Sequence, residues 1–311
     1  MSVTSVSIVI ATLNRREDLR ATMHELQKLN PAPLEILVCL DGSTDGSREM
    51  LHEFDNVRVI ENEEPSGSVF SRDRLFRMAS GDLIVSLDDD SAPMQVDFVS
   101  RVIELANNHP EAGVFAFREI RPAGRDDRPF GAPESKGYIA SYPNCAGAVR
   151  ASLYGDVASY PTLFFHMYEE PDFCLQSYAT GYGVLFEPSI KVLHRYTSVG
   201  RNLIRRHHQH ARNEALSIIM RCPMPHLPWV LAYRGIRQLA YAVSNGPSWV
   251  IREPQWWWRF LSQFHIAWQQ RRPVDWKTYW AWIRLARNPL PPEEEVLFAS
   301  FPVVASRLSR S

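Results

Sequence analysis

Three consecutive aspartates, Asp88, Asp89 and Asp90, follow directly after the apolar run 83–87. The run has the length and composition of a buried strand, and turn-forming residues flank it. Adjacent carboxylates repel one another, so a cation is expected to compensate them. Divalent metals bind oxygen ligands and are often shared with substrate phosphates. The triplet therefore predicts a metal site that also holds a phosphorylated ligand, and a solvated acidic turn is the structural alternative.

A second acidic cluster, Glu169, Glu170 and Asp172, surrounds Pro171. Proline is favoured at the first position of a helix, so Glu170 is expected to cap a helix and Asp172 to lie in its first turn. A helix N-terminus stabilises an anion, which keeps a carboxylate ionised and ready to accept a proton. The cluster therefore supplies candidates for a general base, and simple helix capping is the alternative.

Two polar turns lie upstream of the triplet, and each follows a strand-like run. Asp41 comes directly after the run 35–40, where its carboxylate can accept a hydrogen bond from the imide N–H of uracil or thymine. Thr12 and Asn14 stand at the end of the run 6–13 and can line the same slot. Ordinary turn chemistry is the alternative for Asp41, because aspartate is common in such turns.

The elements that must position these groups alternate between strand and helix. Apolar runs predict strands, and apolar residues at helical spacing predict the helices between them. Strands are expected at 6–13, 35–40, 57–60, 83–87, 113–117, 184–187 and 190–194, and helices around 19–26, 47–54, 66–79 and 94–108. This alternation is typical of a parallel sheet with crossover helices. Ligands of such sheets bind beyond the carboxyl ends of the strands.

Three segments resemble inverting family-two glycosyltransferases in their order and spacing. They are 7–15, similar to the family's opening strand and turn, 41–46, similar to its second conserved turn, and 88–90, similar to its DxD motif. The resemblance covers residues 5 to about 215. It implies an α/β GT-A fold, with a Rossmann-like, mostly parallel sheet flanked by helices and a C-terminal helical extension. The domains would be 1–215, the glycosyltransferase domain, and 216–311, an aromatic-rich helical region.

The resemblance also implies roles for single residues. Asp90 would be the principal protein ligand of a divalent metal, Mn²⁺ or Mg²⁺, with Asp88 and His194 as further ligands. A structural histidine at the end of an apolar strand is the alternative for His194. The segment matching 71–74 faces the nucleoside in the family, although the family residue at Asp73 is usually Asn. The remaining donor-binding candidates are Arg15, Arg72, Asp89 and Gly147.

An inverting transfer needs one general base that deprotonates the acceptor hydroxyl. In the family this base is the Asp of an acidic pair, and the aligned residue here is Glu170, one methylene longer. Asp172 and Glu169 are the other candidates. The implied reaction moves a sugar from a uridine or thymidine diphosphate donor to a saccharide or lipid-linked acceptor, and the metal stabilises the departing diphosphate.

Two other functions are weighed against this one. A sugar nucleotidyltransferase usually carries an early Gly-rich basic phosphate loop, and none stands near 10–15. A non-catalytic nucleotide-sugar-binding or scaffold protein is the second alternative, supported by glutamate at the position where the family has its basic aspartate.

The composition limits the partners and the compartment. The net charge is -1, which gives no reason to expect nucleic acid. The four cysteines match no zinc spacing, and Cys39 and Cys174 are expected to be reduced packing residues. Neither a signal peptide nor a long uncharged apolar run is seen, so we expect a cytoplasmic protein without a transmembrane helix.

Two segments between the acidic clusters and the C-terminal region carry further expectations. The stretch 121–136 has no apolar periodicity and predicts a long loop over the site. A cationic cluster is expected either to close over a diphosphate or to form a solvated helix face. It comprises Arg201, Arg205, Arg206, His207, His208, His210 and Arg212.

All nine tryptophans lie after residue 228, interleaved with Arg and Lys. The pattern is typical of amphipathic helices. Their aromatic faces can be buried in a helical subdomain or a homo-oligomer interface. Alternatively, they can contact the inner face of the membrane peripherally, which would suit a lipid-linked acceptor.

Overall fold

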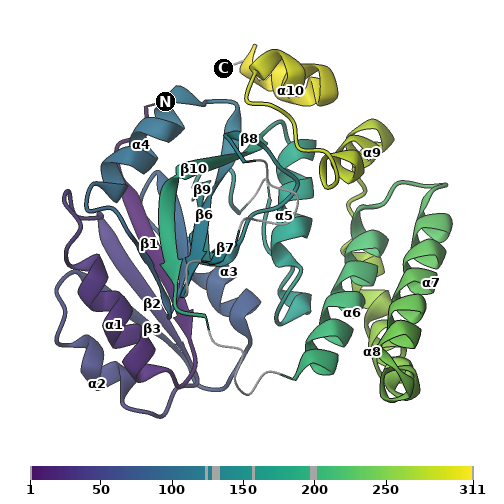
Figure 1. Cartoon of the computed structure of the whole chain (residues 1–311), viewed down its shortest axis with the longest axis horizontal. Coiled ribbons are helices and arrows are strands. Elements are labelled where there is room, and N and C mark those ends of the chain that lie inside the picture. Colours follow the sequence, from purple (N-terminus) through teal and green to yellow (C-terminus); the bar gives the residue numbers. More distant parts are fainter. Residues whose placement is uncertain (1, 123–124, 128–133, 156–157, 197–201, 310–311) are drawn as a thin grey trace.

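The computed structural model describes residues 2–122, 125–127, 134–155, 158–196 and 202–309. Within these residues, ten strands form one sheet with the order β3-β2-β1-β4-β9-β6-β10-β5, while β7 pairs with β6 and β8 with β10. Helices cover the sheet, and the helices of residues 203–269 form a separate layer beside it (Figure 1). The predicted α/β GT-A architecture, mostly parallel and flanked by helices with a C-terminal helical extension, is confirmed.

The parallel half of the sheet brings the predicted strand ends together. It contains β1 (Val6–Thr12), β2 (Glu35–Asp41), β3 (Val57–Asn62) and β4 (Leu83–Asp88). β1 lies between β2 and β4 and pairs with both in parallel. In register, Thr12 faces Leu40 and Ala11 faces Asp88. The carboxyl ends of three strands, with Thr12, Asp41 and Asp88, therefore meet at one edge of the sheet.

The second half of the sheet is mixed. It contains β5 (Ser91–Pro93), β6 (Ala112–Arg121), β7 (Arg125–Asp127), β8 (Gly137–Tyr138), β9 (Gly147–Arg150) and β10 (Gly183–His194). β10 replaces the two predicted strands, and its pairing with β6 is irregular between Glu187 and Lys191, around Pro188. The predicted loop 121–136 contains β7, so this prediction is wrong in part, and residues 123–124 and 128–133 lie outside the described residues.

Helices follow the strands as the spacing predicts. They are α1 (Arg16–Leu26), α2 (Ser47–Leu51), α3 (Ser68–Met78), α4 (Phe98–Asn108) and α5 (Glu169–Ala179), with short 3₁₀ turns at Asn144–Ala146 and Thr162–Phe164. α1 buries Leu19, Met23 and Leu26, the residues whose spacing predicts it. α5 begins at Glu169 with Tyr168 as its N-cap, so the predicted capping role of Glu170 is wrong.

The C-terminal helices are α6 (Leu203–Arg221), α7 (Leu227–Asn245), α8 (Pro247–Gln269), α9 (Trp276–Leu285), α10 (Glu294–Ser300) and α11 (Pro302–Leu308). α6, α7 and α8 pack against one another, and α9 packs on α5 (Figure 1). α6 runs without a break through residue 215, where the domain boundary is predicted. None of the helices that the structure describes is both long and apolar enough to cross a bilayer.

The tryptophans divide between core and surface. Trp256 and Trp282 are buried, whereas Trp229, Trp258 and Trp268 are exposed. The buried rings support the predicted helical subdomain. The exposed rings leave an apolar surface on α7 and α8 that the subdomain itself does not cover.

Candidate functional site

Arg15 neutralises two of the three aspartates. Its guanidinium lies 2.9 Å from Asp89 Oδ1 and 2.8 Å from Asp90 Oδ2, while Thr12 Oγ1 donates to Asp89 Oδ2 at 2.7 Å. Burial, opposed by Arg15 and Thr12, raises the pKa of Asp89 to about 7. Burial also works against ionisation of Asp90, but His194 and Arg15 outweigh it and hold the pKa of Asp90 below its usual value. The protein itself therefore supplies part of the cation that the triplet needs.

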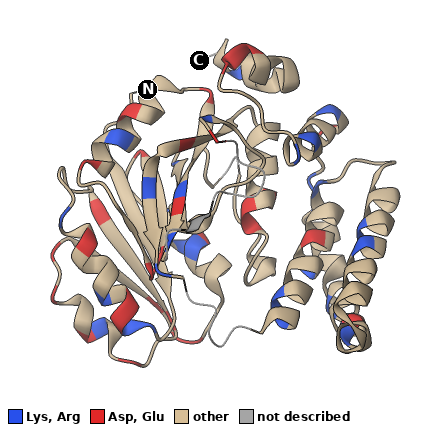
Figure 2. Cartoon of the chain, viewed as in Figure 1, with Lys and Arg blue, Asp and Glu red and all other residues tan. Residues whose placement is uncertain are grey.

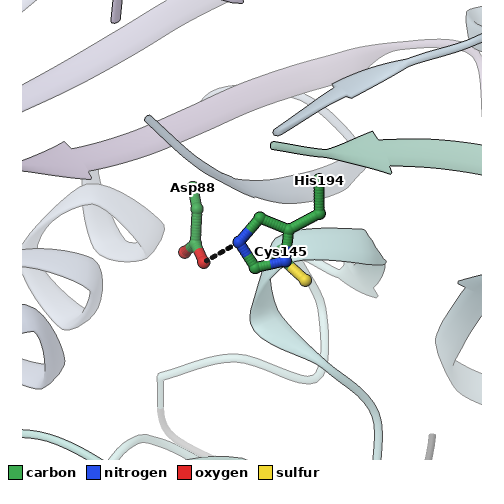
Figure 3. A group of neighbouring side chains, drawn as sticks. All are labelled: Asp88, Cys145 and His194. Atoms are coloured by element: carbon green, nitrogen blue, oxygen red, sulfur yellow. Dashed lines mark ion pairs between the residues drawn. The ribbon is translucent and has the colours of Figure 1, made fainter. Parts of the chain in front are cut away.

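His194 lies at the end of β10 between carboxylates on two sides. Its Nε2 is 3.0 Å from Asp90 Oδ1 and 3.8 Å from Asp88 Oδ2, and its Nδ1 is 2.5 Å from Glu119 Oε1. Burial lowers the pKa of His194, but the adjacent carboxylates of Asp90 and Glu119 outweigh burial and raise it to about 9. Cys145 Sγ lies beside Asp88 and His194 (Figure 3), and the three ligand atoms are within 4.8 Å of one another.

Arg72, on α3, connects the triplet with the second acidic cluster. It forms an ion pair with Asp88, and its Nη1 lies 3.7 Å from Glu169 Oε1. Glu169 is buried, and its Oε1 also accepts a hydrogen bond from Asn144 Nδ2 at 3.0 Å. Arg72 is therefore not a solvated residue of the helix surface, because its side chain is buried between two carboxylates.

Glu170 follows a loop with strained backbone. Phe165, Met167 and Tyr168 have φ angles of 62°, 72° and 71°, which are uncommon for residues other than glycine. Asn213 Nδ2, on α6, donates to the carbonyl oxygens of His166 at 2.8 Å and Met167 at 2.6 Å and holds this loop. Burial and the neighbouring Glu169 carboxylate raise the pKa of Glu170 to about 8.

Two cavities meet over these groups. The first, of about 460 Å³, is lined by Thr12, Arg15, Asp41 and Asp89, and by residues of the loop 165–166 and of α6. The second, of about 590 Å³, is lined by Asp88, Arg72, Glu169, Glu170 and His194 among others. They share Ala11, Arg15, Ser68, Asp89, His166 and Arg206. One continuous cleft therefore joins the ends of β1, β2 and β4 with the start of α5.

Sequence comparison identifies the family of the domain that forms this cleft. A profile described as "Glycosyl transferase family 2" matches residues 7–155, which contain the strand ends and the aspartate triplet. The chain carries a family 2 glycosyltransferase domain.

Two relatives illustrate the range of the family. An uncharacterized glycosyltransferase of Bacillus subtilis is 28% identical over 206 residues, 63% of this chain and 76% of the relative. A UDP-Glc:alpha-D-GlcNAc-diphosphoundecaprenol beta-1,3-glucosyltransferase of Escherichia coli is 33% identical over 87 residues, 27% of this chain and 34% of the relative. Apart from the uncharacterized glycosyltransferase of Bacillus subtilis, these curated relatives are matched over only 32% to 36% of their length.

Two solved structures share the fold. Staphylococcus aureus TarS 1-349 in complex with UDP-GlcNAc aligns with a TM-score of 0.62 at 17% identity, over 99% of this chain and 93% of that chain. The mannosyltransferase PcManGT of Pyrobaculum calidifontis, in complex with GDP-Man and Mn2+, aligns with a TM-score of 0.55 at 17% identity, over 85% of each chain. The alignment with TarS includes the C-terminal helices, so the similarity of fold extends beyond the glycosyltransferase domain.

Three residues predicted to bind the donor of this glycosyltransferase lie elsewhere in the structure. Asn14 is exposed and bonds to the turn after β2, its Oδ1 accepting from the Thr44 N–H at 2.7 Å. Asp73 accepts from Tyr154 Oη at 2.8 Å and pairs with Arg77. None of these three residues (Asn14, Asp73 and Gly147) is among the described residues that line the two cavities.

A neighbouring aromatic ring explains why residue 147 is a glycine. A side chain at this position would collide with the ring of Tyr142. Tyr142 itself lines the second cavity. The small residue therefore makes room for an aromatic ring that faces the cleft.

Asp172 points away from the cleft toward α6. Its carboxylate accepts hydrogen bonds from Ser217 Oγ at 2.6 Å, from Gln176 Nε2 at 2.7 Å and from Arg221 Nη2 at 3.0 Å. It is fully buried and is not among the described residues that line either cavity. This placement argues against Asp172 as a base and shows that it ties α5 to α6.

Asp172→Ala should lower the free energy of unfolding by about 3–5 kcal/mol, because Arg221 would keep a buried charge without a partner. Chemical denaturation followed by circular dichroism measures this loss. Arg101→Ala is the matched control, since the Arg101–Asp97 pair is exposed and should leave stability nearly unchanged. Equal midpoints for both variants would contradict the structural role of Asp172.

The cationic cluster 201–212 is split by the fold. Arg205 and Arg206 line the first cavity, and His210 lines the second. Arg212 is buried and donates to the Phe164 carbonyl at 2.7 Å, so it positions the strained loop together with Asn213. His207 and His208 pack toward α7 and α8, which makes the interpretation of a solvated face wrong for them. Arg201 lies outside the described residues.

Sequence patterns did not indicate Glu119 and Cys145 as site residues. Glu119 lies on β6 opposite Val192 of β10, so its contact with His194 depends on strand pairing. A signal existed in hindsight, because a charged residue continuing the apolar run 112–117 is unusual for a buried strand. Cys145 carries no such signal, since a lone buried cysteine is common.

Proposed function

We propose that this protein is a metal-dependent inverting glycosyltransferase that moves a sugar from a nucleoside diphosphate to an acceptor hydroxyl. The observation that carries the proposal is that Asp88 and His194 line the cleft that Glu170 also lines, with the buried Asp90 directly beside His194. Membership of family 2 supports the reaction type. The metal, the inversion and the residue roles are our proposal.

The donor set fits a divalent cation. Asp88 is 31% exposed and faces the cavity, whereas Asp90 is 1% exposed and backs His194. Asp90 Oδ1 is buried and accepts no well-aligned hydrogen bond, although Nε2 of His194 is 3.0 Å away. Carboxylate oxygens and an imidazole suit Mn²⁺, with Mg²⁺ as the alternative. Burial raises the pKa of the Cys145 thiol, so we assign the ligand roles to Asp88, Asp90 and His194.

When bound, such a metal acts as a Lewis acid that stabilises the departing diphosphate. Its binding would displace the proton from His194 Nε2, because a metal ligand must be deprotonated. Glu119 accepts from Nδ1 and so holds the ring with Nε2 toward Asp88 and Asp90. Arg206 lines the junction of the two cavities and supplies positive charge for phosphate oxygens, whereas Arg15 at the same junction is already paired with Asp18, Asp89 and Asp90.

The first cavity is our proposed nucleotide site. Asp41 Oδ1 already accepts from Asn62 and from the Ser66 N–H, whereas Oδ2 accepts, among the residues that the structure describes, only from the Gly67 N–H at 2.9 Å. A carboxylate oxygen accepts two hydrogen bonds, so Oδ2 retains one position for an imide N–H. This supports uracil or thymine as the base, and therefore UDP or dTDP as the carrier.

Glu170 is our proposed general base. It lines the second cavity, and within the described part of the chain its carboxylate forms no ion pair, unlike those of Glu169 and Asp172. It would accept the acceptor's hydroxyl proton while that oxygen attacks the anomeric carbon opposite the diphosphate. A single displacement of this kind inverts the anomeric configuration.

The acceptor is proposed to be a saccharide or a lipid-linked glycan. The Escherichia coli relative is named for a lipid-linked acceptor, and the exposed aromatic residues of α7 and α8 give this chain a surface for peripheral membrane contact or for a homo-oligomer. A cytoplasmic location, on the inner face of the membrane when the acceptor is lipid-linked, belongs to the same proposal.

A thermal-shift panel tests the proposal first. We expect UDP or dTDP and their sugars to raise the melting temperature in Mn²⁺ and not in EDTA, since a ligand that binds only the folded state stabilises it. Metal-dependent release of UDP from a donor sugar would exclude the non-catalytic alternative. Release of pyrophosphate from a nucleoside triphosphate and a sugar phosphate would instead indicate the nucleotidyltransferase, and no shift with any nucleotide would overturn the transferase.

Glu119→Gln should weaken Mn²⁺ binding by about 10–100-fold, as is usual when the partner of a metal-ligating histidine is removed. The amide can no longer hold His194 in its present orientation by a charged bond. Electron paramagnetic resonance of free Mn²⁺ measures the affinity. Glu187→Gln is the control, because Glu187 is a buried carboxylate on β10 that pairs with Lys136 away from His194. An unchanged affinity in Glu119→Gln would contradict the role of His194.

A further inference from the structure

The catalytic cleft continues into the C-terminal helices. A third cavity, of about 760 Å³, shares residues with the second cavity, including Glu119, Tyr142, Tyr168 and His210. Its far wall is made by α7, by α9 and by the residues directly after α9, and it contains Arg234, Arg237, Trp282, Ile283 and Arg287. The cleft that holds Asp88 and Glu170 is therefore open toward the aromatic-rich region.

A fourth cavity lies at the far end, between α7 and α9. Its volume is about 490 Å³, and it shares Arg234, Ile283 and Arg287 with the third cavity. Its remaining lining is mainly apolar: His226, Trp229, Val230, Tyr233, Trp280 and Arg284. We name the third and fourth cavities together the acceptor trough. It leads from the proposed base to an apolar groove.

The middle of the trough carries uncompensated positive charge. Its two glutamates are already bound, Glu119 to His194 and Glu214 to Arg234 at 3.2 Å. Arg237 and Arg287 are exposed, and neither forms an ion pair with any residue in the described part of the chain. Figure 2 shows basic segments on both α7 and α9. Exposed guanidinium groups that converge on a cavity are suited to phosphate oxygens, which they bind in bidentate fashion.

The end of the trough is apolar and uncovered. Trp229 is 78% exposed and Tyr233 is 51% exposed, and with Ile236 they stand at i, i+4 and i+7 on one face of α7. Trp280 and Ile283 of α9 face them across the fourth cavity. An aromatic groove next to paired arginines suits a ligand with an anionic group followed by an apolar chain.

We propose that the acceptor trough binds an amphiphilic acceptor, a glycan joined through a phosphate or diphosphate to a long apolar chain. The glycan hydroxyl lies at Glu170, the phosphate at Arg237 and Arg287, and the chain along Trp229, Tyr233 and Trp280. This inference rests on the proposed function, because it uses the assignment of the second cavity to catalysis. It extends that function by naming the acceptor class and the residues that select it.

Binding of farnesyl phosphate tests the trough without knowledge of the sugar. The full chain is first saturated with UDP and Mn²⁺ so that the donor cavity is filled, and farnesyl phosphate is then titrated by calorimetry. Farnesol is the probe for the chain alone and inorganic phosphate the probe for the anion alone. We expect farnesyl phosphate to bind at least about tenfold more tightly than either, because charged hydrogen bonds to phosphate add to apolar burial.

The double variant Arg237→Ala/Arg287→Ala should weaken farnesyl phosphate by about tenfold or more and leave farnesol unchanged. Trp229→Ala should weaken both ligands. The double variant Arg252→Ala/Arg259→Ala is the matched control, since it removes two exposed arginines of α8 that line none of the four cavities described and should bind like the wild type.

Three results would each overturn the inference. The first is equal affinity of farnesol and farnesyl phosphate, and the second is equal loss in the two double variants. The third is binding to phosphatidylglycerol vesicles that matches binding to the same vesicles with farnesyl phosphate, which would assign the aromatic face to the bilayer surface. The UDP–Mn²⁺ thermal shift, measured in every variant, reports separately on folding and on the donor site. Its absence in the wild type would overturn the proposed function, and with it the role of the ligand as an acceptor, but not the binding of an amphiphilic phosphate in the trough.

Discussion

Glu170→Gln is expected to lower the turnover of sugar transfer by about 10²–10⁴-fold, the usual contribution of a general base. The amide keeps the size of the side chain but cannot accept the hydroxyl proton. Donor binding should stay within a few fold of the wild type, because Glu170 lines the second cavity and not the first. Steady-state kinetics and a UDP titration measure the two quantities separately.

The pH profile gives the same variant a second readout. Burial and Glu169 raise the pKa of Glu170 to about 8, so the carboxyl is mainly protonated at neutral pH and ionises as the pH rises through 8. A protonated base cannot act, and kcat/KM of the wild type should therefore rise with pH up to about 8 and then level off. The rise should disappear in Glu170→Gln.

Glu169→Gln is the matched control for the base. Glu169 is held by Arg72 and Asn144, so its loss should change the position of Arg72 and affect donor binding, without removing the rise with pH. If the rise of kcat/KM with pH is lost in Glu169→Gln and kept in Glu170→Gln, then Glu169 is the base.

Local sequence patterns were sufficient to predict the half of the fold that forms the proposed donor site. Thr12, Asp41 and Asp88 end apolar runs, and ends of neighbouring parallel strands meet at one edge whatever the details of packing. The order of the segments therefore predicted both the sheet and the place of the triplet. The prediction failed where one element had to be fitted to another: β10 continues past Pro188 because β6 pairs with it on both sides of the irregularity.

The acidic cluster shows why single residues could not be assigned from sequence. Glu169, Glu170 and Asp172 look alike as first-turn carboxylates, and helix geometry alone does not decide their partners. Arg221 and Ser217, about 45 residues downstream in the chain, bind Asp172, whereas Arg72 reaches Glu169 from α3. Only tertiary packing leaves Glu170 to face the cleft. The same holds for Glu119, whose role depends on the register of β6 and β10.

Asp88→Asn is expected to lower Mn²⁺-dependent transfer by about 10³-fold, since Lewis-acid stabilisation of a leaving group contributes several kcal/mol and each 1.36 kcal/mol is tenfold in rate. Asp88 is the aspartate of the triplet that faces the cavity and lies near His194 Nε2. The variant keeps an oxygen at the same place but removes the charge that a divalent cation needs. EDTA treatment of the wild type should produce a loss of similar size.

Variants of Cys145 and His194, the two residues beside Asp88, distinguish metal binding by Asp88 from a general effect of its charge. Cys145→Ala should keep Mn²⁺ affinity within about tenfold, because burial holds the thiol protonated and a neutral thiol is a weak ligand for a hard cation. His194→Ala should lose Mn²⁺ affinity together with Asp88→Asn. Electron paramagnetic resonance of Mn²⁺ measures affinity independently of activity. If Cys145→Ala loses the metal and Asp88→Asn keeps it, the thiol is a ligand and the triplet instead binds Arg15 and Arg72 for structural reasons.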